Sequence, residues 1–118
     1  MRIHFDISTS SYPNETWKDV VGYEGLYLIS SIGRVISTQR YKRDIDILMR
    51  QSLDRYGYYC LMLSNHGKRK HNLVHRLVAK SFIKEDVEKL YVNHKDGNKL
   101  NNCVENLEWC TNDENMHH

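Results

Sequence analysis

The 118-residue sequence predicts an α+β fold, in which a small N-terminal antiparallel β module precedes a unit of two strands and a helix. Three observations support this fold class. Short runs of β-branched and aromatic residues alternate with glycine-containing turns in the first half of the chain. A single amphipathic helical stretch follows over 74–84. The segment 91–118 then has the pattern of a strand, a long polar loop, a strand and a helix start.

The first half of the chain predicts one β-hairpin after an irregular beginning. The residues up to Pro13 are mixed in character, so we expect a loose lead-in there. The runs LYLIS (26–30) and RVIST (34–38) are rich in strand-forming residues, and Gly33 can turn the chain between them. The charged stretch that follows is ambiguous: it suits an exposed loop or a short strand at ILM (47–49).

The middle of the chain predicts a second hairpin and then the helix. GYYCLMLSN (57–65) has the composition of a strand, His66-Gly67 suits a turn, and KRKHNLV (68–74) is the returning strand. The helical stretch 74–84 has one apolar side at helical spacing, formed by Val74, Leu77, Val78, Ser81 and Phe82. The sequence therefore predicts a helix that buries this side against the strands.

The last part of the chain predicts two strands joined by a polar loop. YVNH (91–94) and LEWC (107–110) are the strands, and the loop between them contains an Asp-Gly pair that is typical of a turn. Thr111 followed by Glu114 has the spacing of a capping box, which predicts that a new helix begins there.

The charge of the chain is unevenly distributed. Residues 34–80 hold eleven basic and three acidic side chains, a net charge of +8, whereas residues 1–33 sum to −2 and residues 81–118 to −4. A basic middle between acidic ends suits a polyanionic partner. A solvated charged surface explains the same distribution, so charge alone leaves both interpretations open.

The cysteines and the apolar runs narrow the class of protein. The three cysteines are odd in number and contain no CxxC pair, which argues against a disulfide framework and favours a reducing cytoplasm. The sequence has no secretory pattern at its beginning and no apolar run long enough to span a membrane. We therefore expect a cytoplasmic protein without a membrane partner.

Three polar residues in 91–118 form a candidate site. His94 ends the first strand, Asn106 follows twelve residues later, and Asn115 follows after twenty-one, inside the expected helix. A compact ββα unit can bring His94 and Asn115 to opposite sides of one pocket. The histidine can accept a proton from water near neutral pH, and an asparagine oxygen is a hard ligand for Mg²⁺ or Mn²⁺.

Two extended motifs around these residues resemble a known family. They are LVHRLVAKSFI, VNHKDGNKLNN and ENLEWCT in the second half, and WKDVVGYEGLYLISSIGRVIS in the first. The second half resembles the HNH endonucleases of ββα-metal fold, and in particular the phage and intron homing endonucleases. The first half resembles the NUMOD4 module that accompanies them. The resemblance covers roughly residues 15–115 and implies a NUMOD4-like β module over 15–50 and an HNH nuclease domain over 51–118.

The resemblance implies a role for each residue that matches the family motif. His94 matches the general base, and Asn106 matches the asparagine that pins the loop so that His94 stays aimed. Asn115 matches a metal ligand, and Asn93 occupies a position where many relatives have a metal-binding aspartate. The implied reaction is hydrolysis of a DNA phosphodiester with one Mg²⁺ or Mn²⁺ ion. Because a neutral amide holds a divalent cation less tightly than a carboxylate does, Asn93 is expected to weaken metal binding.

The implied partner is double-stranded DNA, bound by a monomer or a homodimer in a bacterial or phage-infected cell. The expected DNA contacts are Arg34, Lys68, Arg69, Lys70, Arg76, Lys80, Lys95 and Lys99. Homing members usually carry a further helix-turn-helix module. Because the chain ends at His118, we expect weaker specificity, as in a nickase or in a dimer that cuts both strands.

Several residues also suit structural roles, and two rival functions stay open. His75 suits capping or packing, and Asn98, Asn101 and Asn102 are expected to hold the loop. The first rival is a DNA-binding module of the same fold that is catalytically weak or inactive. The second is a structural domain stapled by zinc through Cys103 and Cys110 with His117 or His118, although their spacing differs from paired CxxC ligands.

Overall fold

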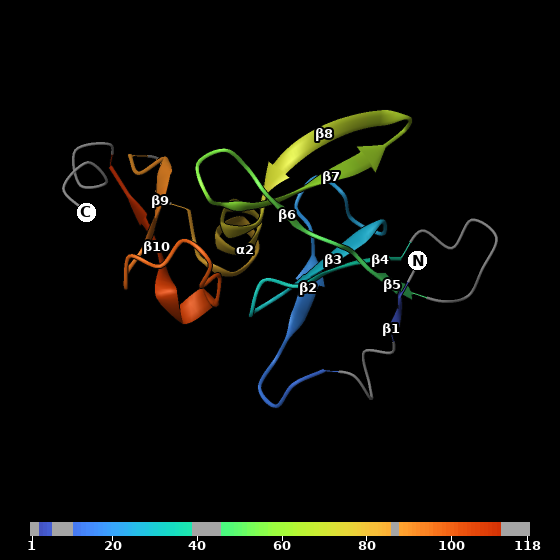
Figure 1. Ribbon diagram of the computed structural model, residues 1–118, viewed down its shortest axis with the longest axis horizontal. Helices are drawn as coiled ribbons and strands as arrows, with labels where there is room; N and C mark the ends of the chain where they lie inside the picture. Colours follow the sequence, from blue (N-terminus) through green and yellow to red (C-terminus); the bar gives the residue numbers. More distant parts are fainter. Residues whose placement is uncertain (1–2, 6–10, 39–45, 86–87, 112–118) are drawn as a thin grey trace.

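The computed structural model describes residues 3–5, 11–38, 46–85 and 88–111 of the chain. Within them, three antiparallel sheets surround one helix, as Figure 1 shows. The α+β prediction is confirmed.

The N-terminal sheet contains the first predicted hairpin. Its five strands, in spatial order, are β1 (Ile3–Phe5), β5 (Asp46–Leu48), β4 (Val35–Ser37), β3 (Tyr27–Ser30) and β2 (Trp17–Asp19). The hairpin of β3 and β4 pairs Ile29 with Val35 and Tyr27 with Ser37, as the sequence predicts. β5 confirms the short strand that the charged stretch left open.

One expectation about this sheet is wrong. We expected no regular structure before Pro13, yet β1 pairs with β5 from Ile3 opposite Leu48 to Phe5 opposite Asp46. Three residues are too few to form a strand on their own local preference. β1 instead depends on a backbone partner more than forty residues later in the chain, which a local pattern does not reveal.

The second sheet consists of β6 (Ser52–Leu53), β7 (Tyr59–Asn65) and β8 (Lys68–Leu73). β7 alternates as a half-buried strand, because Leu61 and Leu63 are buried whereas Met62 is exposed. The predicted turn at His66-Gly67 is confirmed. Both turn residues have positive φ, at 52° and 77°, which suits the tight two-residue turn of a hairpin.

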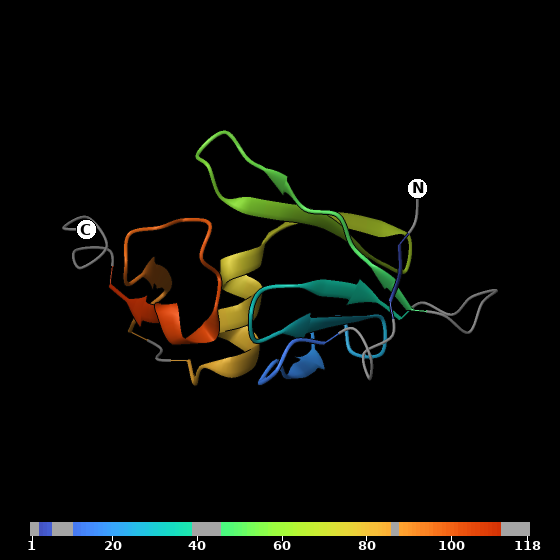
Figure 2. The ribbon, with the colours of Figure 1, turned by 60° about the horizontal axis from the view of Figure 1, so that its bottom comes forward.

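The helix α2 (Val74–Phe82) lies between the N-terminal sheet and the third sheet (Figure 2). It ends two residues before the predicted limit, where the Ile83 N–H donates to the Ala79 carbonyl. Val74, Leu77 and Val78 are buried, as the spacing predicts, and His75 is buried with them. Among the helices of the described residues, none combines the length and apolar character needed to cross a membrane.

The third sheet is a hairpin of β9 (Tyr91–His94) and β10 (Leu107–Cys110), which confirms the two predicted strands. A short 3-10 helix, η1 (Val104–Asn106), leads into β10 and was not predicted. The helix expected from Thr111 lies outside the described residues.

One hydrophobic core joins the sheets. Ile29 and Val35 of the N-terminal sheet share it with Leu63, Val78 and Leu107 from the rest of the chain. The division into units at 15–50 and 51–118 stays a prediction, and packing is continuous across it.

Candidate active site

His94 lies where β9 ends and the polar loop begins. Its backbone pairs with Leu107 of β10, and the Lys95 N–H then donates to the Asn106 carbonyl over 2.8 Å. The chain turns immediately, because the Gly97 N–H donates back to the His94 carbonyl over 2.9 Å. His94 is therefore held by a strand on one side and a tight turn on the other.

Asn106 ties the two ends of the loop together. Its Oδ1 accepts from the Asp96 N–H over 3.1 Å, and its Nδ2 donates to Asp96 Oδ1 and to the Asn101 carbonyl, each over 2.9 Å. Hydrogen bonds from Asn101, from the Asn98 N–H and from Asn106 lower the pKa of Asp96. Asp96 is therefore engaged inside the loop as an acceptor, consistent with a role in the turn.

The imidazole of His94 is surrounded on several sides. Its Nε2 lies 2.8 Å from Oδ1 of Asn102, a hydrogen-bond distance. The ring of Tyr58 stacks with it at 5.9 Å between centroids and 26° between planes, and the ring of His75 lies at 5.0 Å and 55°. His94 and Asn102 are only 6% and 5% exposed. The polar loop, the residue before β7 and α2 thus meet at one imidazole.

His75 is a second imidazole in this cluster. Burial, followed by the neighbouring His94 and Arg76, lowers the pKa of His75 to about 3, whereas Asp54 acts in the opposite direction. Its Nδ1 is buried without a hydrogen-bond partner, alone in this respect among side-chain nitrogen and oxygen atoms of the described residues. Its ring also packs on Tyr58, at 4.9 Å between centroids. His75 is therefore a neutral packing residue beside His94.

Asn93 lies on the other face of β9, because adjacent side chains of a strand alternate. It pairs with Glu108 of β10, and its Nδ2 donates to Glu108 Oε1 over 3.0 Å. This hydrogen bond identifies Nδ2 as the amide atom that faces Glu108. It leaves Oδ1, a hard oxygen, as the atom able to bind a cation. The oxygen fits Mg²⁺ or Mn²⁺, which keep several waters and need few protein ligands. Asn115, the other expected ligand, lies outside the described residues.

The zinc alternative gains no support from the described part of the chain. Cys103 is partly buried and Cys110 is buried, and no disulfide joins them. Within the described ranges, no three His, Cys, Asp or Glu side chains are grouped so that they could hold a metal ion. His117 and His118 lie outside those ranges.

Six of the predicted DNA contacts are exposed cations that fall into three groups. Lys68, Arg69 and Lys70 lie at the tip of the β7–β8 hairpin, Lys80 lies on α2, and Lys95 and Lys99 lie in the loop after His94. Lys99 stays near the site, since its Nζ donates to the Tyr56 carbonyl over 3.0 Å and lies 5.0 Å from the Tyr58 ring centroid. The hairpin tip is at the far end of β7 from Tyr58, roughly 23 Å away at ~3.3 Å per residue.

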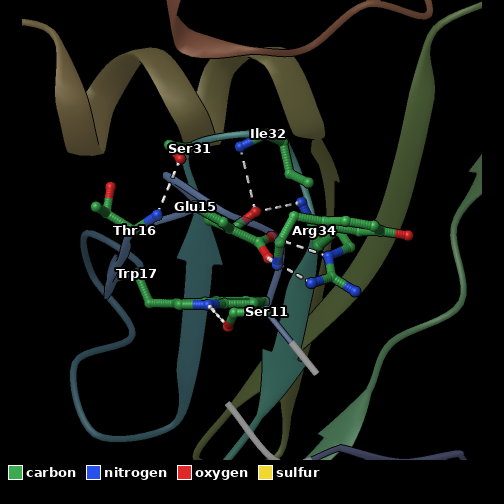
Figure 3. Close-up of polar contacts among 9 residues, drawn as sticks. Ser11, Glu15, Thr16, Trp17, Ser31, Ile32 and Arg34 are labelled. Atoms are coloured by element: carbon green, nitrogen blue, oxygen red, sulfur yellow. Dashed lines mark hydrogen bonds and ion pairs between the residues drawn. The ribbon is translucent and has the colours of Figure 1, made fainter. Parts of the chain in front are cut away.

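The other two predicted contacts are engaged within the fold. The Arg76 guanidinium donates to the Leu90 carbonyl over 3.0 Å and lies over the Trp109 ring. Arg34 forms an ion pair with Glu15, whose side chain is completely enclosed (Figure 3). Burial would raise the pKa of Glu15, but hydrogen bonds, chiefly from Arg34, outweigh it and hold that pKa below its usual value. Contact of either arginine with DNA stays a prediction.

Three residues of the site are not assigned to it by the sequence. Asn102 is one of several asparagines expected to hold the loop, His75 was expected to cap or pack, and Tyr58 was one of two adjacent tyrosines. The alternation of side chains along a strand shows that Tyr58 and Tyr59 face opposite ways. No sequence signal says which of them meets His94.

Comparison with known proteins defines the class. Residues 15–64 match the NUMOD4 motif, and residues 72–117 match the HNH endonuclease family. The chain belongs to the HNH endonucleases in which a NUMOD4 motif precedes the nuclease segment. Dependence on a divalent metal is general in the HNH family.

Individual relatives come from phages. The chain is 43% identical over 95 residues to DNA endonuclease I-HmuI of Bacillus phage SP01. The aligned segment makes up 80% of this chain and 52% of that protein. H-N-H endonuclease F-TflII of Escherichia phage T5 is 37% identical over 83 residues, 69% of this chain and 40% of that one. A solved structure of the homing endonuclease I-HmuI has a TM-score of 0.75 at 40% identity and covers 86% of this chain and 56% of that chain. The chain thus spans about half, or less, of the length of these relatives.

Proposed function

We propose that this protein is a metal-dependent DNA endonuclease that hydrolyses phosphodiester bonds. The observation that carries the proposal is the environment of His94. One ring nitrogen faces Asn102 at 2.8 Å, while the other makes no hydrogen bond with any described residue. A histidine held in this way can take a proton from water. Its place within the segment that matches the HNH family, which follows a segment that matches NUMOD4, supports the assignment.

In the proposed reaction His94 acts as the general base. Its Nδ1 accepts a proton from the water that attacks the scissile phosphorus, and the products carry a 5′-phosphate and a 3′-hydroxyl. Asn106 acts indirectly: by tying Asp96 to Asn101 it holds the loop that follows His94. Lys95 and Lys99, on the same loop, supply positive charge toward phosphate oxygens.

Asn93 and Asn115 would hold the metal, which we propose is Mg²⁺ or Mn²⁺. When bound, such an ion neutralises charge on the scissile phosphate and on the leaving oxygen. The Glu108 carboxylate contributes by accepting from Nδ2 of Asn93, which leaves Oδ1 as the amide atom that can serve as a ligand.

The substrate is proposed to be double-stranded DNA, bound by a monomer or a homodimer in the cytoplasm of a bacterial or phage-infected cell. The basic hairpin tip lies roughly 23 Å from the site, a distance of roughly seven base pairs along a duplex. We infer that Lys68, Arg69 and Lys70 bind phosphates away from the cut, whereas Lys95 and Lys99 bind beside it.

Cleavage of a supercoiled plasmid tests the proposal. Wild type with Mg²⁺ or Mn²⁺ should convert supercoiled DNA into nicked or linear products, and EDTA should prevent it. His94→Ala should abolish cleavage but bind DNA with unchanged affinity in a gel-shift assay. His71→Ala, at an exposed position on β8, is the matched control and should cleave normally. Salt-sensitive binding without cleavage in either metal would instead establish a catalytically inactive DNA-binding module.

A further inference from the structure

Asn102 is the polar residue of the site that the mechanism above does not use. It is buried, it lies eight residues after His94, and its Oδ1 is 2.8 Å from His94 Nε2. We propose that Asn102 is a positioning residue that accepts a hydrogen bond from His94 Nε2–H, and that the turn 30–34 of the N-terminal sheet holds Asn102 in place. The consequence for catalysis rests on the proposed role of His94, whereas the geometry does not.

The hydrogen bond would decide which nitrogen of His94 is the base. A carboxamide oxygen can only accept, so the facing Nε2 has to carry the proton. A neutral imidazole with Nε2 protonated keeps its lone pair on Nδ1. Asn102 therefore selects the tautomer in which Nδ1 can take a proton from water, and without Asn102 both tautomers would be populated.

The neighbouring rings restrain the plane of the His94 imidazole, and Asn102 is the polar partner that sets its rotation. Tyr58 stacks on the imidazole and His75 packs obliquely against it, so both restrain the ring plane. Neither ring is hydrogen-bonded to a His94 nitrogen in the described structure. Rotation within the space left by the rings is thus fixed by the bond to Asn102.

Asn102 rests on a turn that belongs to a different sheet. A Cβ built at Gly33 would lie 2.9 Å from Asn102 Cβ and 3.4 Å from the Asn102 carbonyl oxygen. At the first residue of η1, the Val104 N–H donates to the Ser31 carbonyl over 2.8 Å. The loop after His94 is therefore in direct contact with the turn between β3 and β4, and the absence of a side chain at Gly33 allows the close approach.

This turn is itself fixed by many hydrogen bonds, several of which Figure 3 shows. The Ser30 hydroxyl accepts from the Ile32 and Arg34 N–H groups, and the Ser31 hydroxyl accepts from the Thr16 N–H over 3.0 Å. Arg34 also pairs with the enclosed Glu15. The part of the chain that matches NUMOD4 thus acts as a rigid support for the residue that orients His94.

Two substitutions of Asn102 separate hydrogen bonding from shape. Asn102→Asp keeps an acceptor facing Nε2, whereas Asn102→Leu keeps the branched shape of the side chain and has no acceptor. The first readout is the ¹⁵N resonances of the His94 ring at about pH 8.5, two units above the value of about 6.5 for an ordinary imidazole. Wild type and Asn102→Asp should show Nε2 protonated and Nδ1 unprotonated, and Asn102→Leu should show a mixture.

The second readout is plasmid cleavage at the same pH. We expect Asn102→Leu to lower kcat by about 10- to 100-fold with little change in KM, as for other residues that orient a catalytic group, and Asn102→Asp to stay within about threefold of wild type. A wild-type ring protonated on Nδ1, or an Asn102→Leu variant equal to wild type in both readouts, would overturn the proposal. Equal damage by Asp and Leu would show that Asn102 donates instead, and would overturn it too.

A pair of glycines tests the support by the turn. Gly33 and Gly25 both have positive φ, at +90° and +80°, so alanine strains either backbone. A Cβ at Gly25 meets no atom within 4 Å, whereas one at Gly33 meets Asn102. When both variants are folded, Gly33→Ala should therefore disturb the His94 tautomer and lower cleavage. Gly25→Ala should leave the tautomer and cleavage unchanged. Identical behaviour of the two variants would refute the support by the turn.

If Gly33→Ala does not fold, a measurement on the wild-type protein still tests the support by the turn. The Val104 amide should exchange slowly with solvent, because it is bonded to Ser31. Rapid exchange of this amide would contradict the support. If His94→Ala cut DNA as well as wild type, the proposed function would fail, while the tautomer measurement would still decide the role of Asn102.

Discussion

Replacing His75 with phenylalanine should remove much of the acid sensitivity of this fold. The pKa of His75 is about 3 in the native state, against 6.5 for an ordinary histidine, chiefly because the ring is buried and also because His94 and Arg76 lie near. The unfolded chain therefore binds one proton more than the native protein between these two values. The resulting stability is complete above about pH 6.5 and declines as the pH falls toward about 3.

The size of the effect follows from the shift. Each unit of pKa difference corresponds to about 1.4 kcal/mol, so wild type should lose about 2 kcal/mol of unfolding free energy between about pH 7 and pH 5 through His75 alone. That loss is a large part of the 5–15 kcal/mol typical of a folded domain. Phenylalanine keeps a flat ring beside Tyr58 and His94 and removes the unpaired Nδ1, so stability near pH 7.5 should be unchanged or higher.

Urea unfolding at several pH values checks this prediction. A difference of about 2 kcal/mol corresponds to a shift of the urea midpoint by about 1 M. Between about pH 7 and pH 5 the midpoint of wild type should fall by this amount more than that of His75→Phe. His71→Gln, which replaces an exposed histidine on β8, should follow wild type. Parallel loss of stability in wild type and His75→Phe would refute the reasoning.

The remaining predictions concern the ion pair, the hairpin and the loop. Glu15→Gln should lower the unfolding free energy by about 2 kcal/mol, because it removes the ion pair between Arg34 and an enclosed carboxylate. Glu85→Gln, at an exposed position, should change the unfolding free energy by under about 0.5 kcal/mol in the same denaturation assay. Alanine at Lys68, Arg69 and Lys70 should weaken DNA binding and reduce the slope of log affinity against log salt by up to about 2.7, and an unchanged slope would show that the hairpin does not touch phosphate. Asn106→Ala should lower stability by about 1–3 kcal/mol and speed amide exchange at Asp96, since three hydrogen bonds are lost, and protection as slow as in wild type would contradict the loop-pinning role.

The elements whose causes are local were predictable from the amino-acid sequence alone. Strand-forming composition identified β7, the His66-Gly67 pair identified the turn after it, and helical spacing identified the buried side of α2. The runs YVNH and LEWC on either side of a polar stretch likewise predicted two strands joined by a loop. These features were predictable because each depends on residues within a few positions of one another, where side-chain direction and backbone preference act directly.

Contacts between groups that are distant in the sequence were visible only in the folded protein. Asn98, Asn101 and Asn102 are chemically alike, and only the packing of the loop against Gly33 places the third of them beside His94. β1 likewise exists because β5 offers it a backbone partner. Such contacts depend on how whole sheets pack around α2, so they follow from the summed burial of the core and not from any one stretch of the chain.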